Sequence, residues 1–246
     1  NHVPLYFFGF LEFFAYITYP LVFIAGPIIT FNCFMSQLYK PIKSNNPFES
    51  KLKQATWTIF LNIFLYVLLH YVAINAISIS YKWERWPNPA VIGLIGFVTL
   101  QFMFLKFLCF WRFFRTWALF DNIVAPKNMN RCMHNSFTFP EFWRAWHSSF
   151  NKWTVRYLYI PLGGSKHQHI TIWLIFFFIG LWHDLWWSWV AWALMNCLFF
   201  TIEIAITYYW ARPQVRYLIT SINCYSFQPR FSNKIYRSWH FIGERD

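Results

Sequence analysis

Long apolar stretches separated by short polar ones run through most of this chain. A helix needs about 20 residues to cross roughly 30 Å of hydrocarbon. Measured against that length, the pattern predicts four clear membrane-spanning helices and leaves a fifth and a sixth open. The expected spans lie near residues 5–30, 55–80, 90–120, 170–182 and 185–210.

Few polar side chains interrupt these stretches. Pro20 and Pro27 are expected to kink or end the first span, because proline lacks a backbone donor and clashes with the preceding turn. Glu12 and Glu203 are interpreted first as helix-packing contacts. His183 stands between two apolar runs and fits its surroundings least. An ionisable group at membrane depth is costly, which makes it a functional candidate.

The stretch 138–164 is amphipathic rather than uniformly apolar. Thr138 and Glu141 have the spacing of a capping box, so a helix is expected to begin here. Aromatic residues then recur at helical spacing through 142–159, with polar residues on the other face, until Pro161-Leu-Gly-Gly164 ends the helix. Such a segment is expected to lie in the interface or to re-enter the protein, where polar backbone is buried or lines a cavity.

The composition points to a membrane protein. Hydrophobic residues make up 57% of the chain and charged residues only 12%, against roughly 25% charged residues in soluble domains. So few charges cannot cover a water-exposed surface. We therefore predict an all-α integral membrane protein, a multi-helix bundle forming one domain over 1–246. We expect it to be part of a longer protein, incomplete at both ends.

The net charge of +12 comes from basic residues spread between and after the spans. This is typical of cytoplasmic loops and contact with anionic lipid, and a nucleic-acid partner is not expected. The five cysteines show no CxxC spacing, which indicates neither a disulfide framework nor a zinc site. His167 and His169 form an HxH pair. No carboxylate or thiol lies nearby in sequence, so solvated loop histidines are favoured over a metal site.

The imidazole of His183 has two interpretations. It is either a core histidine that hydrogen-bonds another helix, or a neutral general base that takes a proton from a hydroxyl. His147 and Asn151 are four residues apart and would share one face of a continuous helix. That pair could hold a carbonyl or position a water, or the two could be polar residues of an interfacial helix.

A further group of residues near these histidines is a candidate for substrate binding. The basic side chains could hold the phosphates of a coenzyme, or could equally contact lipid head groups. The two residues that flank His183 complete the group. Its members are Arg144, Lys152, Arg156, Trp182 and Asp184.

Three motifs carry a resemblance to a known family. They are Tyr19-Pro-Leu-x-Phe-Ile-Ala-Gly-Pro-Ile-Ile-Thr-Phe-Asn32, Trp146-His-x-Ser-x-Asn-x-Trp-x-Val-Arg-Tyr-x-Tyr-Ile-Pro-Leu-Gly-Gly164 and Trp182-His-Asp184. Together they resemble the membrane-bound O-acyltransferase (MBOAT) family, in the branch of the glycerol uptake proteins and Hedgehog acyltransferase. Members of this family usually have more helices than this chain shows.

The resemblance implies a helical bundle with a central tunnel, which acyl-CoA enters from the cytosolic side. His183 matches the family's catalytic histidine. The family's second site position falls on His147 or Asn151, and the motif offset favours His147. The resemblance further implies acyl-CoA as the donor without a tightly bound cofactor, and a lipid acceptor such as a lyso-glycosylphosphatidylinositol (lyso-GPI) anchor. We expect a multi-pass protein of the endoplasmic reticulum membrane.

Two rival functions remain open. A transporter of glycerol and protons could use His183, Asp184 and Glu203 as a proton relay. Transporters often contain inverted repeats, and the sequence shows none. A non-catalytic relative could keep the scaffold for regulation, but it would have no need of His183.

Overall fold

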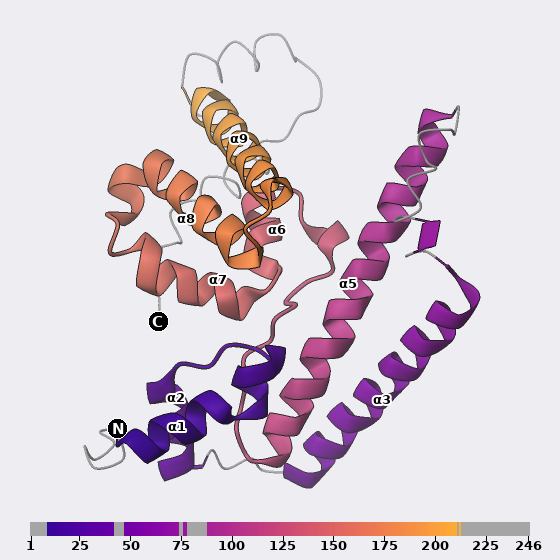
Figure 1. The fold of residues 1–246 in the computed structure, drawn as a ribbon, viewed down its shortest axis with the longest axis vertical. Coiled ribbons are helices and arrows are strands. Elements are labelled where there is room, and N and C mark those ends of the chain that lie inside the picture. Colours follow the sequence, from indigo (N-terminus) through magenta and orange to yellow (C-terminus); the bar gives the residue numbers. More distant parts are fainter. Residues whose placement is uncertain (1–8, 42–46, 74–75, 78–87, 211, 213–246) are drawn as a thin grey trace. The chain divides into compact units, whose positions relative to one another are not determined.

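The computed structural model describes residues 9–41, 47–73, 76–77, 88–210 and 212. Within these ranges the chain forms helices and no strand, which confirms the predicted all-α class. Two compact units, residues 1–130 and 131–246, are described separately below (Figure 1). The prediction that the whole chain forms one membrane domain stays a prediction.

The first unit contains two long helices that pack along each other, α3 (Pro47–Tyr71) and α5 (Pro89–Phe120) (Figure 1). Asn88 caps α5, its side-chain oxygen accepting a hydrogen bond of 2.9 Å from the backbone N–H of Ala90. In the interface the hydroxyls of Thr58 and Thr116 lie 2.8 Å apart. Such polar contacts help hold helices together where lipid offers no hydrophobic drive for association.

The predicted first span is divided in the structure. Helix α1 covers only Phe10–Thr18, and the π-helical turn η2 (Leu21–Ala25) follows. Tyr19 takes an extended backbone with ψ near 126°, because a residue before proline is pushed out of the helical region. The break therefore falls directly before Pro20, one of the two prolines expected to end this helix. Helix α2 (Phe31–Tyr39) comes next.

Among the described residues, three helices are long and apolar enough to cross a membrane: Phe48–Tyr71, Pro89–Phe120 and Trp187–Trp210. They correspond to the predicted spans near 55–80, 90–120 and 185–210, although α3 begins earlier than predicted and residues 78–80 lie outside the described ones. The stretch predicted near 170–182 forms α8 (Gln168–His183), which has 16 residues. At 1.5 Å per residue this helix measures roughly 24 Å, short of the roughly 30 Å of hydrocarbon.

The loop 121–125 after α5 is hydrogen-bonded to several parts of the first unit. Side chains from four elements hydrogen-bond it, at 2.6–3.0 Å. The bonds run from the Tyr19 hydroxyl to Asp121, from the Lys51 ammonium to the Asn122 amide oxygen, from the Val124 N–H to Gln37 and from Arg115 to the carbonyl of Ala125. The loop's Ile123 and Ala125 are buried in one apolar cluster with Phe34, Met35 and Phe114.

The second unit is built on the hairpin of α8 and α9 (Trp187–Trp210) (Figure 1). A Cβ added to Gly180 would lie 3.0 Å from the Cβ of Ala193, so glycine lets the two helices approach closely. Between the same two helices, Phe176, Cys197 and Phe200 belong to a buried apolar cluster. The shorter helices α6 (Phe139–Ala145), α7 (Ser148–Thr154), η5 (Val155–Tyr159) and η6 (Gly164–His167) precede α8.

Replacing Gln37 with alanine should destabilise the first unit. The change removes the 2.7 Å bond from the Val124 N–H and the burial of the amide side chain. We expect a loss of about 1–2 kcal/mol, seen as a lower midpoint of thermal unfolding of the full-length protein in detergent. Asn32→Ala, at an exposed position of the same helix, should shift stability by no more than about 0.5 kcal/mol. Equal midpoints for the two variants would contradict the role given to Gln37.

Candidate active site

The start of α6 is held by two side chains. The hydroxyl of Thr138 accepts a hydrogen bond of 3.2 Å from the N–H of Glu141, which confirms the predicted helix start. The carboxylate of Glu203, from α9, accepts one of 2.9 Å from the N–H of Phe139. Glu203 thus packs helix against helix, as first interpreted, and does so by capping α6. The Glu141 side chain reaches the N–H of Phe137 at 3.4 Å.

The helix expected to continue through 142–159 breaks at His147, so that prediction is wrong here. Trp146 is extended, and His147 has φ 44° and ψ 49°, in the left-handed region. This conformation costs a residue with a Cβ roughly 1–2 kcal/mol. It directs the chain into α7, where the carbonyl of His147 accepts the N–H of Asn151 at 3.0 Å. The pair therefore remains a turn apart, with His147 as the cap of α7 rather than a residue within one continuous helix.

The structure brings His147 close to His183. Burial lowers the pKa of His147 to about 4, a hydrogen bond with its own backbone opposes this, and the charge of neighbouring His183 lowers the pKa further. A ring with such a pKa is neutral at physiological pH. The two histidines come from different elements, the junction of α6 with α7 and the last residue of α8.

Aromatic rings connect the two histidines. The rings of His147 and Phe150 have centroids 5.2 Å apart, and Phe150 stacks on Trp182 at 4.6 Å. Trp182 in turn lies 4.9 Å from the ring of His183. Each imidazole is therefore positioned by rings, and Phe150 and Trp182 lie between them in this series of contacts.

Residues of α9 hold His183 from the other side. Its ring stacks on Trp189 with centroids 4.6 Å apart and planes 9° from parallel, and the edge of Trp192 lies at 5.6 Å. The sequence pattern did not predict Trp189 and Trp192 as site residues. Their spacing of three residues in an apolar helix that follows His183 directly is the signal that could have found them.

The turn after α8 is open. Leu185, Trp186 and Trp187 are 82%, 71% and 84% exposed, and His183 is exposed as well. Asp184 accepts the N–H of Leu185 at 2.7 Å through Oδ1, so it shapes this turn. Trp182 is half-exposed and contacts both Phe150 and His183.

The predicted phosphate-binding residues lie in two places. Lys152 and Arg156 are exposed on α7 and η5, about a turn apart. Arg144 is half-buried on α6, its Nε donating to the carbonyl of Pro140 at 3.3 Å. Its Nη2 is buried, and no acceptor among the described residues reaches it. Burial lowers the pKa of Arg144.

The HxH pair is divided between two elements. His167 ends η6 and His169 lies in the first turn of α8, both exposed. The described residues contain no cluster of three or more histidine, cysteine or acidic side chains that could hold a metal ion.

Residues 3–240 match the model of MBOAT, the membrane-bound O-acyltransferase family. This chain belongs to the MBOAT family. The family resemblance expected from the three motifs is confirmed, and with it the character of an integral membrane protein.

Relatives within the MBOAT family cover most of the chain. The membrane-bound O-acyltransferase gup1 of Schizosaccharomyces pombe is 41% identical over 78% of this chain and 33% of its own length. The membrane-bound O-acyltransferase GUP1 of Saccharomyces cerevisiae is 41% identical over 83% of the chain and 36% of its own. The protein-cysteine N-palmitoyltransferase HHAT of Mus musculus is 25% identical over 82% and 42%. The chain thus spans about a third of the length of the first two relatives.

The depressed pKa of His147 predicts how stability depends on pH. The folded value is about 4, against 6.5 for an unperturbed imidazole. Between these values the unfolded chain binds more protons than the folded one, so stability falls as pH drops from about 6.5 to 4 and is constant above. The full effect is about 3 kcal/mol. Thermal midpoints of the full-length protein at pH 7 and pH 5 should register about 2 kcal/mol of it.

His147→Asn should lose this part of the pH dependence, because the amide does not titrate. His167→Asn removes an exposed histidine and should keep the behaviour of the unchanged protein. A His147→Asn variant with an unaltered pH dependence would contradict the burial of the His147 ring.

Proposed function

We propose that this chain carries the catalytic part of an acyltransferase that moves a fatty acyl group from acyl-CoA to a hydroxyl of a lipid acceptor. The observation that carries the proposal is that His147 and His183 lie close together and are linked by the stacked rings of Phe150 and Trp182. One imidazole is buried on a strained backbone, and strain of this kind gathers at functional sites. Membership of the MBOAT family supports the reaction type.

In this mechanism His183 acts as general base. Its imidazole takes the proton from the acceptor hydroxyl while that oxygen attacks the carbonyl carbon of the acyl thioester. The carbon–sulfur bond then breaks, CoA leaves as a thiolate, and the imidazolium returns the proton to the sulfur. The exposed edge of His183 lets an acceptor reach it, while stacking on Trp189 fixes the ring plane.

His147 is assigned to polarise the thioester carbonyl or to orient the acceptor. A neutral imidazole can donate one hydrogen bond to a developing oxyanion, and such a contact is strong where water is excluded. Asn151, one turn further along, is the second candidate for this role. Arg144, Lys152 and Arg156 are assigned to the phosphates of acyl-CoA, and Trp182 and Asp184 to the substrate beside His183.

An oxygen acceptor is supported by the names of the relatives. Both yeast relatives at 41% identity are named O-acyltransferases. HHAT, at 25% identity, is named a protein-cysteine N-palmitoyltransferase, so its acceptor is a nitrogen. We propose a lyso-GPI anchor as the lipid acceptor and the endoplasmic reticulum membrane as the location, both on the resemblance to the glycerol-uptake-protein branch.

Replacing His183 should abolish acyl transfer. Loss of a general base costs about 10²–10⁴-fold in rate. Membranes bearing the full-length protein would be given labelled acyl-CoA and the labelled lipid identified. His183→Ala should show that loss, and His167→Ala, at an exposed position in η6, should retain full activity. Acylation by His183→Ala at the rate of the unchanged protein would contradict the mechanism. Labelled glycerol uptake lost through His183→Ala, with acylation unchanged, would favour a transporter.

Variants at His147 separate a polar role from a purely structural one. Asparagine can occupy the left-handed region and donate a hydrogen bond, whereas alanine can do neither well. We expect His147→Asn to keep at least tenfold more acyl transfer than His147→Ala, a difference of about 1.4 kcal/mol. Single-turnover rates at saturating acyl-CoA measure it. Equal rates for variants of equal thermal stability would contradict the assigned role.

A further inference from the structure

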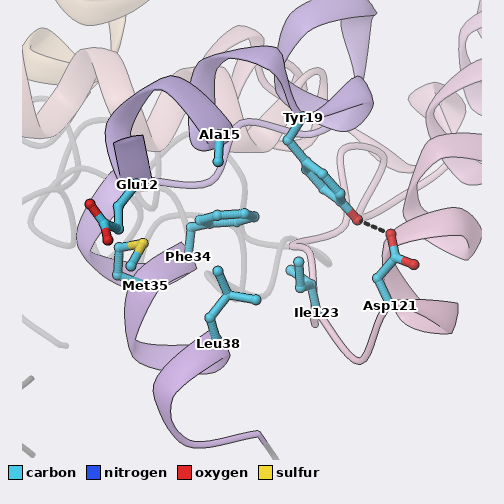
Figure 2. Close-up of a pocket in the computed structure, with 8 residues that line it drawn as sticks. All are labelled: Glu12, Ala15, Tyr19, Phe34, Met35, Leu38, Asp121 and Ile123. Atoms are coloured by element: carbon cyan, nitrogen blue, oxygen red, sulfur yellow. Dashed lines mark hydrogen bonds between the residues drawn. The ribbon is translucent and has the colours of Figure 1, made fainter. Parts of the chain in front are cut away.

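A cavity of about 360 Å³ opens in the first unit, between α1, α2 and the residues that follow α5 (Figure 2). Its size lies at the lower end of the range for small-molecule sites, about 300–1,000 Å³. The wall is almost wholly apolar. It consists of Ala15 on α1, of Phe34, Met35 and Leu38 on α2, and of Ile123.

Two carboxylates lie on opposite sides of this cavity, Glu12 on α1 and Asp121 at the end of α5 (Figure 2). Asp121 is exposed, and its Oδ2 accepts a hydrogen bond of 2.6 Å from the hydroxyl of Tyr19. That bond fixes the orientation of the carboxylate and leaves Oδ1 for a second donor. Within the described part of the chain no cation pairs with either carboxylate.

The carbonyls at the end of α5 are already bonded. Those of Trp117, Ala118 and Leu119 accept backbone N–H groups of residues 121–123. The chain already places one cation here, since the ammonium of Lys51 contacts the carbonyl of Phe120 and the amide oxygen of Asn122, at 3.4 and 2.9 Å. The far side of the cavity, toward α1 and α2, holds no basic side chain among its lining residues.

The position of the cavity suits a ligand from the membrane. Helix α5 is long and apolar enough to span a bilayer, and the cavity lies beside its last residues. Its 32 residues measure roughly 48 Å, more than the roughly 30 Å of hydrocarbon, so the helix extends into the head-group region. An apolar wall with a charged rim at that depth matches an amphiphile, which has an apolar chain and a polar head.

We propose that this cavity binds the apolar chain of a membrane amphiphile whose protonated amine donates to Asp121. The alkyl chain of the amphiphile contacts Phe34, Met35, Leu38 and Ile123, and its ammonium donates to Asp121 from inside the cavity, where no basic side chain lines the wall. Glu12 on the opposite rim adds attraction for a cation and disfavours a carboxylate head. The site is independent of the acyl transfer proposed for the second unit.

Photo-crosslinking of the full-length protein in detergent tests this assignment at pH 7. The probe is a long-chain primary amine with a diazirine in its chain, and labelled peptides are located by mass spectrometry. We expect labelling within α1, α2 and the loop 121–125. Unlabelled competitors of equal chain length should displace the probe in the order amine, alcohol, carboxylate, with amine about tenfold better than alcohol. That is the value of one charge-assisted hydrogen bond.

Two matched pairs of variants make the result specific. Asp121→Asn can still accept the Tyr19 hydroxyl but should remove the preference for amine over alcohol, whereas Glu49→Gln, an exposed carboxylate on α3, should leave it intact. Ala15→Leu should fill the cavity and reduce labelling by the amine probe, whereas Ala90→Leu, at the exposed start of α5, should not.

Three results would overturn the proposal. An alcohol or carboxylate that competes as well as the amine, labelling outside the cavity, or a preference that survives Asp121→Asn would each do so. Thermal midpoints equal to those of the unchanged protein establish that each variant is folded. Acyl transfer measured in the same preparations reports on the second unit, so failure of one proposal is distinguishable from failure of the other.

Discussion

The left-handed backbone at His147 is the constraint on which the candidate active site depends. It ends α6, redirects the chain into α7 and buries Ser148, Ser149 and Phe150 directly behind the turn. Phe150 is the ring through which His147 is linked to Trp182 and hence to His183. A strained residue persists only where its surroundings over-determine it. The capped start of α6 and the buried start of α7 are those surroundings, because each fixes one side of the turn.

The other half of the site depends on close helix packing. Gly180 lets α8 approach α9 so nearly that an added Cβ would lie 3.0–3.1 Å from Ala193 Cβ and the carbonyl oxygen of Trp189. That approach holds the end of α8 against Trp189 and Trp192, which contact the ring of His183. The two histidines are therefore placed by separate devices, a backbone turn on one side and a helix hairpin on the other. Glu203 couples the two, since it belongs to α9 and caps α6.

The long helices, the end of the first helix at Pro20 and the start of α6 at Thr138 could be predicted because each leaves a local signal. A long apolar run, a proline and a capping residue can each be recognised from consecutive residues of the sequence. The break at His147 leaves none. Neither glycine nor proline stands there, and the aromatic spacing continues across the break. The role of Glu203 was predicted only as packing, because its partner Phe139 is 64 residues away in sequence and no local pattern contains that contact.

The carboxylates of the second unit bear on the proposal that an imidazole carries the proton. Among its described residues the acidic side chains are Glu141, Asp184 and Glu203, and each accepts a backbone N–H next to a helix start. These carboxylates stabilise backbone turns in an apolar protein, where an unpaired N–H is costly. An anionic carboxylate is a stronger acceptor than a protonated one, so protonating Asp184 or Glu203 would weaken the turn or the helix cap that it bonds. In the proposed acyl transfer the imidazole of His183 takes up and returns the proton instead, while the backbone around it stays bonded.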